Sequence, residues 1–223
     1  MQKKRKIEKV FGNEESKWYS IKRNTFFTIL TVLFVIGFFL RRYLSAFTGL
    51  KYIQYINAAS FLGLIVVVAT FHLGDRMFSL SLRKRDYIFV YLMSITGIIF
   101  SALYFRYAIY DKIEHLFFPM MFASITFYIL TRKLKISLGW RLFLTFFIIV
   151  GFLSLFEVWE YFLDLGFNWK MQGVFQITET GEYIETLGRI DDTMIDIGLG
   201  ILGTLIYTLS VLFIEKKKLK QKH

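Results

Sequence analysis

The feature that most constrains the fold is a series of six long apolar stretches in a chain of 223 residues. A bilayer core about 30 Å thick needs roughly 20 such residues to be crossed by one helix. The stretches occupy residues 25–40, 52–73, 87–105, 113–130, 142–163 and 192–214. A soluble domain of this length would not offer so many of them. The sequence therefore predicts an all-α, polytopic membrane protein with a bundle of six transmembrane helices.

Positive charge is unevenly distributed among the segments that separate these stretches. Lys and Arg number 21 in segments 1–24, 74–86, 131–141 and 215–223, against 7 in the alternate segments. Because positive charge marks the cytoplasmic side, both termini are predicted to be cytoplasmic. The net charge of +11 is therefore interpreted as a topology signal, and the expected partner is the lipid bilayer rather than nucleic acid.

The predicted organisation is one membrane domain with two polar ends. Residues 1–24 form a basic cytoplasmic segment, 25–214 the six-helix domain, and 215–223 a basic cytoplasmic tail. The one long connection is the outer loop 165–190, and loops of that length are usually functional or disordered. Its aromatic residues favour a cap over the helix ends, with a re-entrant segment as the alternative. The chain has no cysteine, which excludes disulfides and thiolate metal sites.

Acidic residues and a histidine gather at the outer ends of the last three predicted helices, although they are distant in sequence. They are Asp111, Glu114 and His115 in the fourth helix, Glu157, Glu160 and Asp164 in the fifth, and Asp192 and Asp196 in the sixth. Ionisable groups at the edge of a bilayer are costly, so such a cluster is a functional-site hypothesis by default. The alternative is a structural network that links helices and caps their ends, with no substrate.

The spacing within this cluster suggests its chemistry. Positions three or four apart are neighbours on a helix, which pairs Asp111 with His115 and Asp192 with Asp196. Carboxylates this close cannot all remain ionised unless a cation lies among them. Candidate cations are Lys112, Arg106, Arg189 and a divalent metal ion. The candidate metal ligands are His115, Glu157, Glu160, Asp192 and Asp196, and this oxygen-rich set suits Mg²⁺, Mn²⁺ or Fe²⁺ better than Zn²⁺.

Without a metal, the same side chains have a catalytic interpretation. His115 beside a carboxylate is a candidate general base or proton relay, and Asp111 and Glu160 are the other candidate catalytic residues. Pro119, the only proline, lies four residues after His115 and predicts a kink that either opens the site or serves packing.

The stretch Gly198-x-Gly200-x-x-Gly203 matches a dinucleotide-binding motif by letter. It lies inside a hydrophobic stretch and follows no soluble strand, so it fails the structural context that the motif requires. Small residues that let helices approach closely explain it better.

Three short motifs carry a resemblance to a known family. They are Asp111-Lys112-x-x-His115, Glu157-x-x-Glu160, and Arg189-x-x-Asp192-x-x-x-Asp196 before a glycine-containing last helix. They resemble motifs of VanZ-like membrane proteins and, more closely, of YjdF-like bacterial inner-membrane proteins. VanZ-like proteins usually have Gln at position 160 and Asn at position 196, so the extra carboxylates of this chain favour cation binding. The resemblance implies a bacterial plasma-membrane protein and no established reaction; VanZ itself is linked to glycopeptide-antibiotic tolerance.

Together these observations predict a multi-pass plasma-membrane protein with an outward-facing polar site. The leading hypothesis is that the site acts on or handles an envelope lipid or cell-wall precursor, with Arg189 as a phosphate contact and a divalent metal as one candidate cofactor. The second hypothesis is a proton- or cation-coupled transporter of a small substrate. The third is a non-catalytic membrane partner with a structural polar network.

Overall fold

The computed structural model describes residues 32, 36, 58–100, 103–167, 170–178 and 182–221. The chain divides into two compact units, Met1–Ile65 and Val66–His223, and the second contains most of the described residues. The predicted first stretch, except for positions 32 and 36, and the beginning of the second lie outside the described residues. The count of six helices, the boundaries of the terminal segments and the cytoplasmic location of the termini therefore stay predictions.

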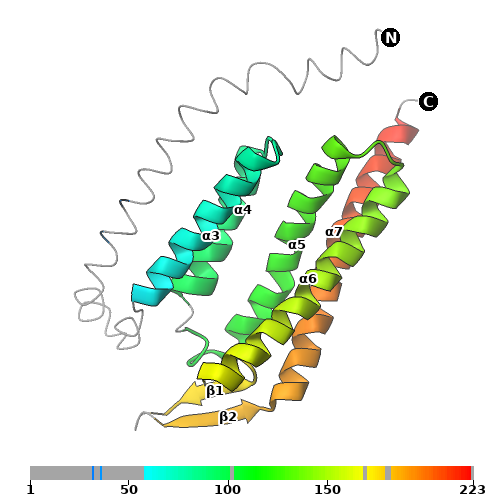
Figure 1. Cartoon of the computed structure of the whole chain (residues 1–223). Coiled ribbons are helices and arrows are strands. Elements are labelled where there is room, and N and C mark those ends of the chain that lie inside the picture. The colour runs from blue at the N-terminus through cyan, green and yellow to red at the C-terminus, as the bar shows by residue number, and fades with distance from the viewer. Residues whose placement is uncertain are drawn as a thin grey trace. The chain divides into compact units, whose positions relative to one another are not determined.

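The described chain is mostly helical (Figure 1). Its elements are α3 (Ala58–Met77), α4 (Lys84–Ser94), the π-helix η2 (Ile95–Ile99), α5 (Ala108–Lys133), α6 (Leu138–Phe167), β1 (Val174–Ile177), β2 (Tyr183–Leu187) and α7 (Arg189–Lys220). Helix α3 runs from the first unit into the second.

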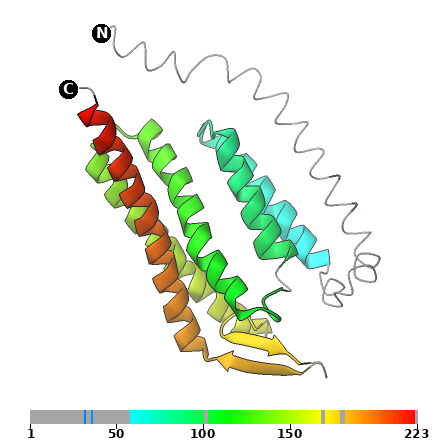
Figure 2. The ribbon, with the colours of Figure 1, turned by 180° about the vertical axis from the view of Figure 1, so that it is seen from behind.

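Three of the described helices, α5, α6 and α7, are long and apolar enough to cross a membrane. They contain the fourth, fifth and sixth stretches identified in the sequence. The three helices lie side by side in both views (Figures 1 and 2). Chain direction alternates along this bundle, so the start of α5, the end of α6 and the start of α7 lie at the same end. The β-hairpin formed by β1 and β2 lies there too, and this end is called the hairpin end below.

A periodic stripe of small and polar residues on α5 and on α7 brings these helices together. On α5 the buried stripe includes Asp111, His115, Pro119 and Ala123, which recur every four residues. On α7 it is Asp192, Asp196, Gly200 and Thr204. Residues four apart share a helix face, so each stripe forms one continuous contact surface. Many of the remaining apolar side chains point outward, as expected for helices surrounded by lipid.

Two glycines of α7 lie where neighbouring helices pack closely against it. A Cβ atom on Gly203 would lie 2.2 Å from the carbonyl oxygen of Leu116 on α5. A Cβ atom on Gly200 would lie 2.4 Å from a terminal carbon of the Leu153 side chain on α6. The helix-packing interpretation of the glycine motif is therefore confirmed at these two positions.

The prediction of an all-α chain is wrong for the connection between α6 and α7. Residues of this connection form β1 and β2, paired antiparallel with Gln176 opposite Ile184. Gly173 precedes β1 with φ 84°, a conformation that glycine adopts without steric cost. The third stretch also differs from its prediction, because α4 and η2 end at Ile99 rather than at residue 105. Helix α5 continues through Pro119, which is buried.

Candidate functional site

The polar residues singled out in the sequence lie together at the hairpin end. Seven buried carboxylates are found there among the described residues, together with the buried His115. The carboxylates are those of Asp111, Glu114, Glu157, Glu160, Asp164, Asp192 and Asp196. Asp191 is exposed. Burying so many acidic groups is costly unless other groups compensate their charge.

Lys112 compensates three of these carboxylates. Its Nζ lies 2.7 Å from Asp111 Oδ2 and 2.8 Å from Asp196 Oδ1, and it also donates to Asp192 Oδ1. The Lys112 side chain is 14% exposed, so solvent screens these interactions only weakly. The ammonium group joins the start of α5 to the start of α7.

His115 lies between two other carboxylates. Its Nε2 is 3.3 Å from Asp111 Oδ1, and its Nδ1 is 3.8 Å from Glu157 Oε1. Asp111 therefore contacts both Lys112 and His115. A carboxylate on one ring nitrogen orients the imidazole and fixes which nitrogen carries the proton, as in a general base.

The backbone that leads into the hairpin closes the ends of α6 and α7. Asp164 accepts hydrogen bonds from the backbone N–H groups of Met171, at 2.7 Å, and Gln172, at 3.0 Å. Asp192 accepts one from Gly173 N–H at 2.8 Å. The segment after α6 therefore caps the helix ends, as its composition had suggested, and two acidic residues at these ends serve to hold it.

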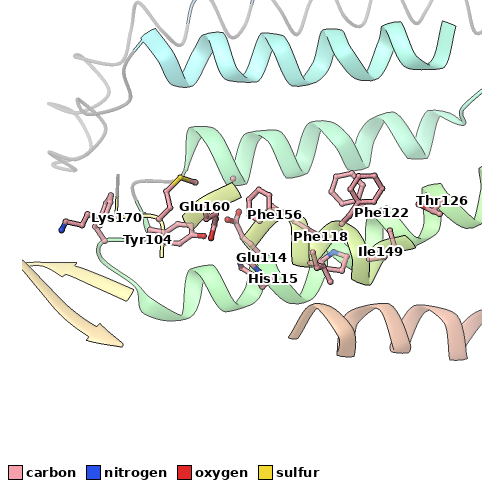
Figure 3. A pocket seen from close by; sticks show the side chains of 16 residues that line it. Tyr104, Glu114, His115, Phe118, Phe122, Thr126, Ile149, Phe156, Glu160 and Lys170 are labelled. Carbon is pink, nitrogen blue, oxygen red and sulfur yellow. The ribbon is translucent and has the colours of Figure 1, made fainter. Parts of the chain in front are cut away.

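A cavity of about 720 Å³ extends from this cluster along α5 and α6 (Figure 3). One end is lined by polar groups, among them Glu114, His115 and Glu160. The rest is lined mainly by apolar side chains, which include Phe118, Phe122, Ile149, Phe152, Leu153 and Phe156. Figure 3 shows this polarity, with Lys170 and Tyr104 at one end, Glu160, Glu114 and His115 next to them, and Phe122 and Thr126 toward the other end. Its volume is in the range of small-molecule sites.

Two further carboxylates line the polar part of the cavity and are not contacted by Lys112. Glu114 is 6% exposed, and its Oε1 is buried with no hydrogen-bond partner among the described residues. Glu160 is 5% exposed. A buried polar group without a partner is costly and calls for a functional or structural explanation.

The comparison with protein families assigns the chain at a coarse level. A family model described as "Predicted membrane protein (DUF2238)" matches residues 18–217. The chain belongs to this family. The match supports a membrane protein with apolar transmembrane helices and leaves the VanZ-like and YjdF-like names as resemblances. Comparisons with curated proteins and with solved structures gave no match.

Members of the predicted ligand set differ in how well they fit a metal ion. Asp111, His115 and Asp196 each offer one donor atom, and these atoms lie within 4.8 Å of one another. Asp111 was predicted as a catalytic residue rather than as a ligand. Glu157, Glu160 and Asp192 do not belong to that group of three. Because the Lys112 ammonium contacts both aspartates of the group, a divalent ion would have to displace it.

The structure also separates the basic residues that were candidates for this site. Arg189 and Arg106 are exposed and form no ion pair with a described carboxylate. Ser154, three positions before Glu157 on α6, is exposed and donates to the carbonyl of Val150 on its own helix. Lys112 is therefore the cation that contacts the described cluster.

Sequence reasoning missed the apolar part of the site. Phe118 and Phe122 lie one and two turns beyond His115 on α5, on the face that lines the cavity. Their spacing from His115 was a usable signal, since residues three and seven positions apart lie on nearby parts of a helix surface. Ile149 and Leu153 come from another helix, and only packing reveals that they line the same cavity.

Proposed function

We propose that this protein binds an amphiphilic envelope lipid or lipid-linked cell-wall precursor and handles it at the hairpin end of the membrane domain. The observation that carries the proposal is the cavity, because it is apolar along most of its length and ends at buried carboxylates and a histidine. A water-soluble substrate would gain little from a wall of phenylalanine side chains. A lipid would place its chain there and its headgroup beside His115.

The charge distribution supports a location in the plasma membrane with the hairpin end outward. Segments rich in Lys and Arg alternate with segments that contain few of these residues, as expected for six helices with both termini in the cytoplasm. In this orientation the site opens toward the outer leaflet, where envelope precursors are used. The bacterial origin of these precursors follows from the motif resemblance alone.

In this proposal His115 is the central residue of the headgroup site. Its contact with Asp111 would orient the ring for proton transfer, and Glu160, which also lines the cavity, would be the second acid or base. Arg189, first considered as a phosphate contact, would reach a headgroup only outside the cluster, because its side chain is exposed.

A metal-dependent variant of this function is supported by the donor group Asp111, His115 and Asp196. A divalent ion there could polarise a phosphoryl oxygen or activate a water molecule. Metal content by mass spectrometry tests this variant in the wild type beside Asp196→Asn and His115→Ala. Stoichiometric metal that is lost in both folded variants would support it, and metal-free protein would reject it.

Transport and a purely structural role are less well supported. Buried polar side chains also occur in the described halves of α5–α7 away from the hairpin, among them Thr145, Thr204 and Thr208. These three hydroxyl groups donate to carbonyls of their own helices. These hydroxyl groups do not extend the carboxylate cluster toward the other side. A structural network alone would leave both the cavity and the unpartnered Glu114 Oε1 unexplained.

The decisive test is whether the cavity holds an alkyl chain. Thr126 lines the cavity far from the cluster, whereas Thr131 on the same helix is exposed (Figure 3). Binding of hexadecanol and decanol to the full chain is measured by native mass spectrometry for Thr126→Phe and for the matched control Thr131→Phe. Blocking space for about two methylene groups removes roughly 1.6 kcal/mol of apolar burial, or about tenfold in affinity.

The expected result is that Thr126→Phe weakens hexadecanol about tenfold, affects decanol less than about threefold, and that Thr131→Phe changes neither. Failure of wild-type protein to bind either alcohol would overturn the proposal. Equal effects of the two phenylalanine variants would also overturn it, since binding would then not depend on the cavity.

A further inference from the structure

The charges of the hairpin end show which carboxylates are free to meet a ligand. Lys112 contacts Asp111, Asp192 and Asp196, and backbone N–H groups of the connection after α6 hold Asp164. Glu157 lies beside His115. This leaves Glu114 and Glu160, and these two acidic residues line the cavity.

These two carboxylates differ from a solvated acidic patch. Glu114 is 6% exposed with Oε1 unpartnered among the described residues, and Glu160 is 5% exposed. Both lie at the boundary between the polar and apolar parts of the cavity in Figure 3. Groups there would meet the first polar atoms of an amphiphile whose chain runs toward Thr126.

The charge at this boundary selects among headgroups. A buried carboxylate forms its strongest interactions with an ammonium or guanidinium group, and it repels phosphate and carboxylate. Lys170 also lines the cavity, but Figure 3 places it beyond Tyr104, away from the apolar part. Its ammonium forms no ion pair with a described carboxylate, so Lys170 does not neutralise Glu114 or Glu160; His115 is the basic residue that lines the cavity beside them.

We infer that the preferred ligand is a long-chain amine: an amphiphile with a single alkyl chain in the cavity and a cationic nitrogen held between Glu114 and Glu160. This inference rests on the proposed lipid-binding function and adds the charge of the headgroup. The cationic nitrogen supplies the partner that Glu114 Oε1 lacks within the described chain. An anionic headgroup at the same depth would meet two carboxylates and is disfavoured.

The test compares three probes that share one chain and differ in headgroup charge: hexadecylammonium, hexadecanol and hexadecanoate. Their binding to the full chain is measured by native mass spectrometry at neutral pH. Wild-type protein is expected to bind hexadecylammonium about tenfold or more tightly than hexadecanol, and hexadecanoate most weakly.

Variants assign this preference to the two carboxylates. Glu114→Gln and Glu160→Gln are each expected to weaken hexadecylammonium about tenfold while hexadecanol binding changes less than about threefold, which also shows that the cavity is intact. The control is Asp191→Asn, an exposed acidic residue at the start of α7, and it is expected to leave all three affinities within about twofold.

The possible outcomes distinguish failure of the amine preference from failure of the proposed lipid-binding function. Equal binding of the three probes, or tighter binding of hexadecanoate, overturns the amine preference and leaves lipid binding in place. Loss of the ammonium preference in Asp191→Asn as well overturns the assignment to Glu114 and Glu160. Binding of none of the probes overturns both the inference and the proposed function.

Discussion

The contact between α5 and α7 at Gly203 gives a graded prediction for three alanine substitutions within one helical stretch. A methyl group at Gly198 would meet nothing within 4 Å, one at Gly200 would meet the end of the Leu153 side chain at 2.4 Å, and one at Gly203 would meet the Leu116 carbonyl at 2.2 Å. A leucine side chain can change rotamer, whereas a carbonyl within a helix cannot move without its helix. The expected order of destabilisation is therefore Gly203→Ala, then Gly200→Ala, then Gly198→Ala.

The magnitudes follow from two opposing terms. Alanine in place of glycine inside a helix favours the helix by about 1 kcal/mol, and this is the whole effect expected at Gly198. At Gly203 the two helices must separate by roughly 1 Å, an overpacking cost of about 3 kcal/mol. The net loss of about 2 kcal/mol corresponds to a melting temperature lower by about 4–8 °C, against a rise of about 2–4 °C for Gly198→Ala.

Thermal unfolding of the purified variants in one detergent, followed by tryptophan fluorescence, measures this order. Gly200→Ala also has a second readout, because Leu153 lines the cavity and its displacement should weaken hexadecanol binding. The reasoning is refuted if Gly203→Ala melts at or above the temperature of Gly198→Ala. It is equally refuted if Gly200→Ala is the least stable of the three, since a flexible side chain would then resist more than a backbone.

Further predictions concern the charged groups of the site. Lys112→Met leaves three carboxylates without their cation and should lower the free energy of unfolding by about 3–5 kcal/mol. The control is Lys218→Met, where the lysine of the ion pair is 60% exposed and the loss should be less than about 1 kcal/mol. Thermal unfolding compares the two variants. Mn²⁺ should raise the melting temperature of Lys112→Met more than that of the wild type, because the departing ammonium opens Asp111, His115 and Asp196 to a cation; an equal rise in both would contradict this account. Asp164→Asn keeps only one of the two oxygens that accept from Met171 and Gln172, so it should speed amide hydrogen exchange at one of these residues, as Asp191→Asn should not; unchanged exchange would show that the helix end holds this segment by other contacts.

Periodic features of the sequence were sufficient to predict the three described membrane helices and the meeting of the acidic residues at one end of them. The alternating direction of successive helices brings Asp111, Asp164 and Asp192 to one end whatever the details of packing, so their meeting required no knowledge of side-chain contacts. The close helix contacts at Gly200 and Gly203 were also predictable, because their spacing of three places both near one helix face.

The hairpin escaped prediction because its strands are short and irregular. The register shifts between Val174 and Phe175, and both side chains are buried, which breaks the alternation by which a half-buried strand is recognised. Its connection to the helices depends on Asp164 and Asp192, which lie outside the strands and accept hydrogen bonds from the backbone of residues 171–173, just before β1. No local pattern records such contacts.

The role of Lys112 was underdetermined for a different reason. It is the neighbour of Asp111 in sequence and does not share a helix face with it, so helical spacing gave it no priority over Arg106 or Arg189. The long flexible stem of lysine lets the ammonium reach partners away from its own face. Which basic residue compensates the carboxylates depends on the rotation of α5 against α7, and that rotation is set by packing around Gly203.

The Lys112 contacts also set an order of events during biosynthesis. Asp192 and Asp196 follow Lys112 by 80 and 84 positions, and in the completed structure both accept from its ammonium. At about 5–20 residues per second, translation leaves α5 in the membrane for roughly 4–17 s before these partners are made. Throughout that interval the ammonium has Asp111 as its described acidic neighbour, so α5 must be retained at the insertion machinery or the interface until α7 arrives. Truncation before Asp192 removes both partners and should therefore expose α5 to quality-control proteases, although α5 itself is intact.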